Sequence, residues 1–226
     1  MPNIITAKNL TIAFGKNKVI DSANFTIADG DFVCVVGANG SGKSTLIKSI
    51  LNIIKINRGK IIYGKDITNT TIGYLPQESK VDQNFPTTVF EIVLSGTLGR
   101  LKFRPFYRKA DKELAEKALD TLKISHLKDK SFADLSGGQK QKVLLARALT
   151  ATSKVLILDE PSNHLDHNSK TDFYDTLKEI NQDLNITIIM ITHDLDADDL
   201  IGNKILAIEN GRVKIHSTAD FLRSYR

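Results

Sequence analysis

The sequence has little cysteine and no long apolar run. Its single cysteine, Cys34, excludes an intramolecular disulfide, and its position inside an apolar strand pattern predicts a thiol packed in the core. The longest strongly apolar stretches, residues 32–36 and 186–191, are far shorter than the roughly 20 residues that span a bilayer. Residues 1–5 lack the basic start and long apolar run of a secretory signal. We therefore expect a chain that does not cross a membrane and remains in the cytoplasm.

Length and composition place the chain among ordinary folded proteins. It has 226 residues, of which 41% are apolar and 25% charged, and no internal repeat, low-complexity tract or proline-rich linker interrupts it. The net charge of +5 would suit anionic nucleotides, membrane headgroups or nucleic acid, and it does not choose among them. The chain is long enough to bury a substantial core, and these features together predict one domain.

Three short apolar runs predict strands that are buried on both faces. They are residues 32–36, 155–158 and 186–191. Between the last two runs, Phe173, Leu177 and Ile180 recur at helical spacing. This alternation predicts parallel strands joined by crossover helices.

The ends of the chain have different patterns. Residues 3–27 read as short antiparallel strands with a turn at residues 15–18. The dipeptide Asn210-Gly211 between two apolar segments predicts a hairpin, and a short helix is expected from about Thr218.

The middle of the chain, from about residue 87 to 150, reads mostly as helix. Residues 111–122 place four apolar side chains on one face, namely Leu114, Ala118, Leu119 and Leu122. We therefore predict an α/β fold with an N-terminal antiparallel β subdomain and a helical insert. The α/β core and the β subdomain would comprise residues 1–76 and 151–226, and the helical lobe residues 77–150.

A glycine-rich loop follows the first buried run and precedes a helical pattern. It fits G-x-x-x-x-G-K-[ST] and consists of Gly37, Ala38, Asn39, Gly40, Ser41, Gly42, Lys43 and Ser44. Backbone N–H groups and the positive end of the next helix can surround a β-phosphate, Lys43 can bind the β and γ oxygens, and Ser44 can hold Mg²⁺. The loop predicts an ATP site in a P-loop NTPase core of the RecA-like type. Its glycine spacing does not give G-x-G-x-x-G, which disfavours a nicotinamide or flavin role.

Two carboxylates follow the second buried run. Asp159 leaves the strand beside the loop and can hold Mg²⁺ directly or through water, and Glu160 can polarise an attacking water. Two carboxylates at one strand end are costly without a cation. A pair that merely starts a helix is the alternative.

Four further segments resemble a known family. They are Leu75-Pro76-Gln77, Leu135-Ser136-Gly137-Gly138-Gln139, Ser162-Asn163-His164-Leu165-Asp166 and Ile191-Thr192-His193-Asp194. Together with the phosphate loop, they resemble the ATPase subunits of ATP-binding-cassette (ABC) transporters over essentially the whole chain. The resemblance implies a single nucleotide-binding domain over residues 1–226 and an enzyme that hydrolyses ATP.

The resemblance also implies roles for single residues. The catalytic residues would be Lys43, Gln77, Glu160 and His193, and the Mg²⁺ ligands would be Ser44, Gln77 and Asp159. ATP would be bound by residues 37–44, by Thr45, and by Phe14 at the position that stacks on adenine. The signature residues Ser136, Gly137, Gly138 and Gln139 would bind the γ-phosphate of ATP held by a second copy, because a helix starting at Ser136 can point its N–H groups at phosphate. Asp166 would act across the same dimer.

Some of these residues have plainer readings. A lone histidine at a strand end, such as His193, is usually structural, Gln77 alone would be an ordinary polar turn, and Phe14 could belong to the core. His164 has no independent case as a ligand. Lys142 stands where the family usually has arginine, which could weaken a bidentate contact near the signature helix, and Phe14 replaces the commoner tyrosine.

An acidic cluster near the C-terminus suggests a calcium loop at first sight. It contains Asp194, Asp196, Asp198 and Asp199. No glycine stands at the sixth position, and Ile205 occupies the place of the closing glutamate. We predict instead that the last three aspartates form the acidic start of a helix.

Residues 85–96, followed by Gly99 and Arg100, are similar to the helical lobe of zinc and manganese importer ATPases, and in part to that of iron-chelate importers. This resemblance implies a second copy of the subunit, an integral membrane permease whose coupling helix docks on residues 77–96, and indirectly a substrate-binding protein. The chain would lie peripherally at the cytoplasmic face of the membrane, and no nucleic acid is expected as a partner.

A basic, aromatic stretch in the lobe has two readings, a solvated loop or a contact with headgroups or the permease. It contains Arg100, Lys102, Phe103, Arg104, Phe106, Tyr107, Arg108 and Lys109. Two other classes of function fit the sequence less well. Soluble cassettes that act on nucleic acid or ribosomes usually carry two cassettes or long inserts, and a scaffold without hydrolysis would not need intact Lys43, Asp159, Glu160 and His193.

Overall fold

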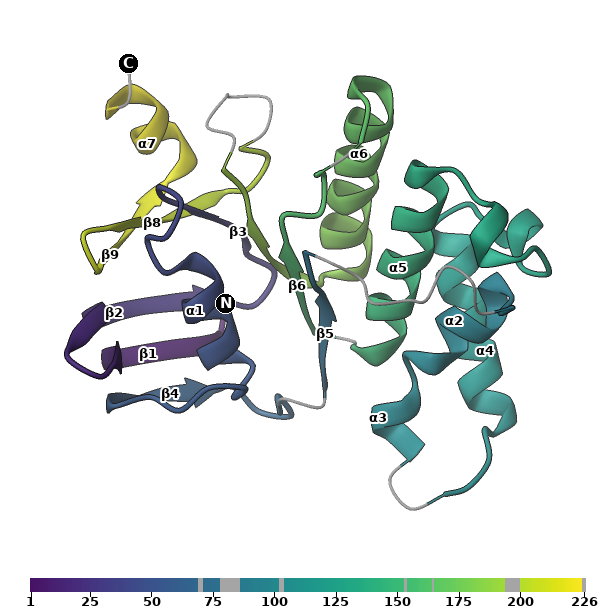
Figure 1. The fold of residues 1–226 in the computed structure, drawn as a ribbon, viewed down its shortest axis with the longest axis horizontal. Helices are drawn as coiled ribbons and strands as arrows, with labels where there is room; N and C mark the ends of the chain where they lie inside the picture. Colours follow the sequence, from purple (N-terminus) through teal and green to yellow (C-terminus); the bar gives the residue numbers. More distant parts are fainter. Residues whose placement is uncertain are drawn as a thin grey trace.

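The fold combines two sheets with a group of helices that stands to one side of them (Figure 1). The structure is a computed structural model, and it describes residues 1–68, 71–77, 86–101, 104–152, 154–163, 165–193 and 200–224. None of the helices within these residues is long and apolar enough to span a membrane.

The larger sheet has the strand order β5-β6-β7-β3-β8-β9. Its strands are β3 (Phe32–Val36), β5 (Ile72–Leu75), β6 (Val155–Asp159), β7 (Thr187–Ile191), β8 (Lys204–Glu209) and β9 (Arg212–Ser217). The first five strands in this order are parallel, and β9 runs antiparallel to β8. Every residue of β3, β6 and β7 is buried. The three apolar runs are thus confirmed as parallel strands covered on both faces.

The β8–β9 connection is the predicted hairpin. Asn210 and Gly211 form its two-residue turn, with φ values of 49° and 76°. Two positive φ angles in succession are the geometry of a type I′ turn, which asparagine and glycine adopt more readily than other residues.

The smaller sheet is antiparallel, with the order β2-β1-β4. It consists of β1 (Asn3–Phe14), β2 (Asn17–Ala28) and β4 (Arg58–Tyr63). The tight turn between β1 and β2 includes Gly15 at φ 61°. The N-terminal antiparallel prediction is confirmed, and β4 is a third strand that the sequence patterns did not indicate.

Helices cover the sheets and form the predicted lobe. They are α1 (Lys43–Ile50), α2 (Val89–Ser95), α3 (Leu98–Leu101), α4 (Lys109–Thr121), α5 (Gly137–Ala151), α6 (His167–Leu184) and α7 (Thr218–Ser224), with 3₁₀ turns at Ser125–Leu127 and Phe132–Asp134. Figure 1 shows α2 to α5 together at one side, with α6 between β6 and this lobe. The described part of residues 87–150 is mostly helical, and the last helix begins at Thr218, as predicted.

Alternate residues of each central strand pack on opposite faces of the larger sheet. In β6, Val155 and Ile157 belong to the core that includes α1 and the smaller sheet. Leu156 and Leu158 belong to the other core, which includes α5 and α6. Asp159 continues the first series, so its side chain lies on the α1 side of the sheet, next to the phosphate loop.

The buried face predicted for residues 111–122 is partly wrong. Ala118, Leu119 and Leu122 are buried, but Leu114 is only partly buried and Ala115 is fully buried in its place. Leu114 and Ala115 both lie at helical spacing from the buried residues Ala118 and Leu119. Periodicity therefore could not choose between them, and the prediction took leucine because its side chain is larger. Leu114 lies at the edge of the face, where it lines a pocket of about 250 Å³ on the lobe surface.

Candidate functional site

The predicted phosphate loop joins β3 to α1, and Lys43 and Ser44 are the first residues of the helix. Gly42 precedes the helix with φ 104°, and a Cβ added there would lie 2.6 Å from Cγ1 of Val19. Both the backbone conformation and the lack of space therefore require glycine at this position. The consequence is a turn that leads directly into the positive end of α1.

The loop borders an open cleft with two adjoining parts. The first, of about 890 Å³, lies over residues 37–41 and extends to the β8–β9 turn. The second, of about 480 Å³, is lined among others by Lys43, Ser44, Thr45, Gln77, Glu160 and His193. Segments that are far apart in the sequence thus meet at one cleft.

Lys43 is buried beneath the loop that it belongs to. Its Nζ donates hydrogen bonds to the carbonyl oxygens of Gly37, at 2.8 Å, and Ala38, at 3.2 Å. An ammonium group has three protons to donate, so these two contacts engage two of them. The positive charge lies where a phosphate in the cleft can reach it.

Asp159 brings a buried carboxylate to the same place. It is 4% exposed, and among the described residues its Oδ1 has no hydrogen-bond partner while Oδ2 accepts a long hydrogen bond of 3.4 Å from the Tyr74 hydroxyl. Burial first and the Glu160 charge second raise the pKa of Asp159, although the hydrogen bond from Tyr74 and the charges of Lys48 and Lys43 oppose this. A buried oxygen without a donor fits a divalent cation, which carboxylates bind readily.

Glu160 is held by two amide donors. Its Oε2 accepts hydrogen bonds from Nε2 of Gln77, at 2.7 Å, and Nδ2 of Asn163, at 2.6 Å. Nδ1 of His193 lies 3.8 Å from the same oxygen. The backbone of Glu160 has φ 50°, which is uncommon for a residue other than glycine. A strained backbone at a strand end beside a cleft is typical of functional sites.

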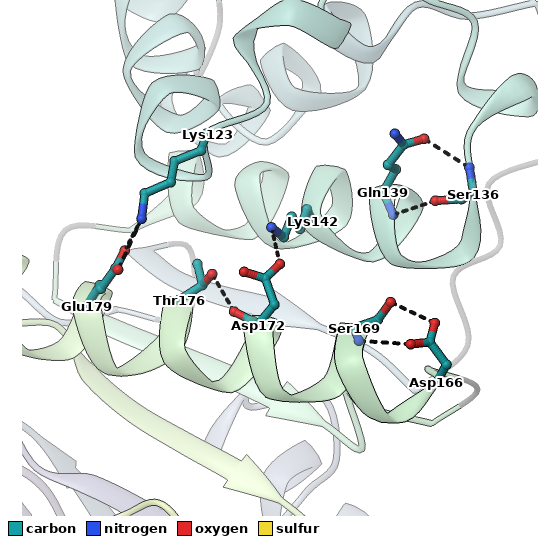
Figure 2. Close-up of polar contacts among 9 residues, drawn as sticks. All are labelled: Lys123, Ser136, Gln139, Lys142, Asp166, Ser169, Asp172, Thr176 and Glu179. Atoms are coloured by element: carbon teal, nitrogen blue, oxygen red, sulfur yellow. Dashed lines mark hydrogen bonds and ion pairs between the residues drawn. The ribbon is translucent and has the colours of Figure 1, made fainter.

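The signature residues lie elsewhere on the chain. Ser136 caps α5, because its Oγ accepts a hydrogen bond of 3.3 Å from the backbone N–H of Gln139, while Oε1 of Gln139 accepts one of 3.1 Å from the N–H of Ser136 (Figure 2). This reciprocal pair is a capping box. Gly137 has open space around it, with no atom within 4 Å of an added Cβ. None of these residues lines the cleft of the phosphate loop.

A phosphate loop, a strand-end carboxylate pair and a separate serine-capped glycine turn therefore occur on one α/β core. The family model described as ABC transporter matches residues 20–163 of the chain. The chain belongs to the ABC transporter family. The chain, hereafter the cassette, is an ATP-binding and ATP-hydrolysing subunit.

Curated relatives and solved structures agree with this family. The cassette is 34% identical over 213 residues to the high-affinity zinc uptake system ATP-binding protein ZnuC of Bacillus subtilis, covering 92% of each chain. It is 33% identical to the zinc uptake system ATP-binding protein ZurA of Listeria monocytogenes, over 100% of the cassette and 90% of that protein. The structure of cbiO1 from Clostridium perfringens, part of the ABC transporter complex cbiONQ, has a TM-score of 0.86 at 28% identity and is matched over 92% of its length by the whole cassette.

Asp166 and Phe14 both lie outside the cleft of the phosphate loop. Asp166 caps α6, since its Oδ1 accepts a hydrogen bond of 3.0 Å from the backbone N–H of Ser169 and its Oδ2 accepts one of 2.7 Å from the Ser169 hydroxyl. These hydrogen bonds lower the pKa of Asp166. Phe14 is the last residue of β1 and is 58% exposed. The reading of Phe14 as a core residue is wrong, and its predicted stacking on adenine stays a prediction.

Three other predictions concern single side chains of the cassette. Cys34 is fully buried in β3, and burial raises the pKa of its thiol to about 12, which confirms the core reading. Lys142, in place of the family's arginine, forms an ion pair with Asp172 at 2.5 Å. In the basic stretch, Arg104 is paired with Asp111 at 3.3 Å, while Phe106 is 79% exposed.

Some predictions lie outside the described residues. These are His164, the acidic cluster at residues 194–199, Lys102 and Phe103, and residues 78–85 at the start of the expected permease groove.

Sequence reasoning gave no role to two residues of the site. Tyr74, on β5, donates a hydrogen bond from its hydroxyl to Asp159, and Asn163 donates one from its side-chain amide to Glu160. Tyr74 could have been found from its position three residues before Gln77 at a strand end. Asn163 follows Glu160 by three residues, the spacing of a turn, which was a signal that the side chains could meet.

Proposed function

We propose that the cassette is the motor of an importer for a metal ion of the zinc or manganese type. The observation that carries the proposal is its identity of 33–34% with two zinc uptake ATP-binding proteins over nearly their full length. In this proposal the cassette binds an integral membrane permease at the cytoplasmic face of the membrane. A separate substrate-binding protein delivers the metal ion to that permease.

The phosphate loop binds ATP in this proposal. Backbone N–H groups of residues 37–44 and the start of α1 surround the β-phosphate, and Lys43 exchanges its loop carbonyl contacts for the β and γ oxygens. Thr45 lines the same part of the cleft. Phe14 approaches the adenine from the end of β1, as the family resemblance implies.

Ser44, Gln77 and Asp159 would hold Mg²⁺. The buried Oδ1 of Asp159, without a partner among the described residues, supports this assignment. The ion supplies charge neutralisation on the β and γ phosphate oxygens when it is bound.

Glu160 acts as the general base that accepts a proton from the attacking water. Gln77 and Asn163 both donate to Oε2, which fixes the carboxylate plane, and we assign Oε1 to the water. His193, on the same cleft, contacts the γ-phosphate. Its Nδ1, 3.8 Å from Oε2 of Glu160, is close enough for a small rotation to join the two side chains.

The signature residues complete the site of a second copy. Ser136, Gly137, Gly138 and Gln139 lie at the start of α5, away from the cleft of their own chain. Two cassettes arranged head to tail would place each signature turn on the γ-phosphate of the other's ATP, with Asp166 at the same interface. The proposal treats residues 1–226 as one domain, with the lobe boundaries between β5 and Gln77 and at the end of α5.

The catalytic assignment predicts a specific effect of Glu160→Gln. An amide cannot accept the proton of water, so steady-state ATP turnover of the assembled transporter should fall by about 100-fold or more. ATP binding, measured by calorimetry on the isolated cassette, should be retained because glutamine keeps the shape of the side chain. Glu116→Gln, the same change on the exposed face of α4, is the matched control. Unchanged turnover in Glu160→Gln would remove Glu160 from the base role.

The transport assignment is tested in cells that lack the gene for the cassette. Uptake of radioactive zinc and manganese, and growth in a zinc chelator, should fall in these cells. The cassette should restore both, and Glu160→Gln should not. If metal uptake stays normal while uptake of an iron chelate falls, the cassette serves a different importer. Retention of the cassette on RNA at moderate salt, without a membrane partner, would place it among soluble ABC ATPases.

A further inference from the structure

The start of α5 and the start of α6 lie at the same end of a helix pair (Figure 2). Ser136 caps the first helix and Asp166 caps the second. In the proposed dimer these two caps are the parts of one chain that meet the second copy. Any contact that fixes one helix against the other therefore fixes the two caps relative to each other.

The first such contact is between the two first turns. A Cβ added to Gly138 would lie 3.2 Å from Oγ of Ser169, so glycine lets the signature turn approach α6 closely. The same Oγ donates a 2.7 Å hydrogen bond to Oδ2 of Asp166. The signature turn and the cap of α6 thus share Ser169 as a neighbour.

The second contact is an ion pair one turn further along. Nζ of Lys142 lies 2.5 Å from Oδ2 of Asp172. Lys142 is four residues after Gly138, and Asp172 is three residues after Ser169, so each helix uses one face for both contacts. A shift of α5 along α6 would break the two contacts together.

A third contact connects α5 to the segment that follows Glu160. Nε2 of Gln141 donates a 2.6 Å hydrogen bond to the carbonyl oxygen of Pro161. The helix that carries the signature is therefore held both to α6 and to the backbone between Glu160 and Asp166.

The ion pair is unequal in its exposure. The side chain of Lys142 is 20% exposed and that of Asp172 is 64% exposed. A lysine side chain that is mostly covered has few other conformations to adopt, whereas the exposed carboxylate of Asp172 adds little to the core. We therefore expect this ion pair to affect the position of α5 against α6 more than the free energy of unfolding.

We propose that Lys142 and Asp172 are positioning residues for the ATP-dependent pairing of two cassettes. Their ion pair fixes α5 against α6, so that the signature turn and Asp166 face the second copy as one rigid unit. The inference rests on the proposed head-to-tail dimer. It gives a role within the chain to the lysine that stands in place of the family's arginine.

The chain contains a matched control for this ion pair. Lys123 and Glu179 also join the lobe to α6, at 3.0 Å, with side chains that are 73% and 49% exposed (Figure 2). Glu179 lies seven residues beyond Asp172, two turns further from the caps. If joining the lobe to α6 were all that mattered, the two pairs would behave alike.

The experiment uses the Glu160→Gln cassette, in which we expect ATP to be bound with little turnover. Dimerisation with Mg-ATP is measured by analytical ultracentrifugation, ATP affinity of the dilute monomer by calorimetry, and Tm by calorimetric unfolding. Asp172→Asn and Lys142→Gln are compared with Glu179→Gln and Lys123→Gln. A double variant, Lys142→Asp with Asp172→Lys, restores the pair in the opposite sense.

We expect Asp172→Asn and Lys142→Gln to weaken dimerisation by about fivefold or more, the upper part of the range for an exposed pair, with ATP affinity of the monomer unchanged. The double variant should recover most of the loss, and the control variants should change dimerisation by less than about twofold. Equal effects of the two pairs, or an equal loss of monomer ATP affinity, would overturn the inference alone. If the Glu160→Gln parent itself does not dimerise with ATP, the proposed sandwich fails and the inference fails with it.

Discussion

At the scale of single residues, the Asp159 carboxylate at the end of β6 stabilises neither the strand nor the core. Asp159 continues the buried series of β6 but replaces an apolar side chain with a carboxylate. Tyr74 offers it one long hydrogen bond, and burial and the same carboxylate raise the pKa of that tyrosine to about 12. The fold thus carries a cost at Asp159 that a bound cation would offset.

This cost predicts that Asp159→Asn stabilises the nucleotide-free cassette. Tm should rise by about 2–4 °C, which corresponds to roughly 1 kcal/mol in a chain of this length. Mg-dependent ATP turnover should fall by about 100-fold or more, since the amide is a poor cation ligand. Asp129→Asn, the same change at an exposed position, is the control for Tm.

The pH dependence of the difference in Tm provides a second check. Because the pKa of Asp159 is raised in the folded cassette, its ionisation destabilises the fold fully above that pKa. The destabilisation fades as the pH falls from that pKa toward the ordinary pKa of an unfolded aspartate. The increase in Tm caused by Asp159→Asn should therefore be largest at neutral pH and become smaller in acid. An advantage that is constant with pH, or a lower Tm at neutral pH, would contradict this account.

The residue types of the site could be predicted from the sequence, but their contacts could not. Lys43, Glu160 and Gln77 stand in recognisable segments at strand ends. The hydrogen bond between Gln77 and Glu160 joins positions 83 residues apart, and that between Tyr74 and Asp159 joins positions 85 apart. Both depend on β5 pairing with β6, which no local pattern encodes.

At the scale of elements, the close packing of α2 against α5 depends on Gly96. Its φ of −63° is that of an ordinary helical residue, so conformation does not require glycine there. An added Cβ would overlap the carbonyl oxygen of Arg147 and the hydroxyl of Thr150 on α5. Space, rather than backbone freedom, explains this glycine.

We therefore expect Gly96→Ala to destabilise the cassette by about 3 kcal/mol, or roughly 6–12 °C in Tm, because backbone atoms of α5 cannot move aside cheaply. Calorimetric unfolding measures the effect. Gly137→Ala is the matched control, since it lies at the first position of α5 with open space around it. It should leave Tm within about 1 °C, as expected for a surface change. Similar losses in both variants would show that the crossing of α2 and α5 is not the cause.

The elements themselves were predictable where one strong pattern decided them. β3, β6 and β7 are mostly apolar and buried along their whole length, and the β8–β9 turn has the asparagine and glycine that its φ angles need. β4 is mostly exposed, and β5 is only four residues long with a glycine inside, so neither has a clear period. Their existence follows from pairing with β1 and β6, which depends on the whole fold.

At the scale of the whole molecule, one cassette carries the two halves of the proposed composite site without bringing them together. The phosphate loop lies at one cleft, and the signature turn lines a different pocket, of about 260 Å³, between α5 and α6. A single chain should therefore bind ATP and hydrolyse it slowly. Turnover per subunit should rise with protein concentration as pairs form.

Mixing two inactive variants tests this arrangement directly. Lys43→Ala removes the charge at the phosphates, and Gly137→Glu places a carboxylate in the open space that would face the partner's γ-phosphate. Each variant alone has both sites of its dimer spoiled. A mixed dimer has one site with an intact loop and an intact signature, and the other site carries both defects. With random pairing half of the dimers are mixed, so ATP turnover should recover to about a quarter of the parent value. If the mixture is no more active than its components, the two halves do not meet across copies.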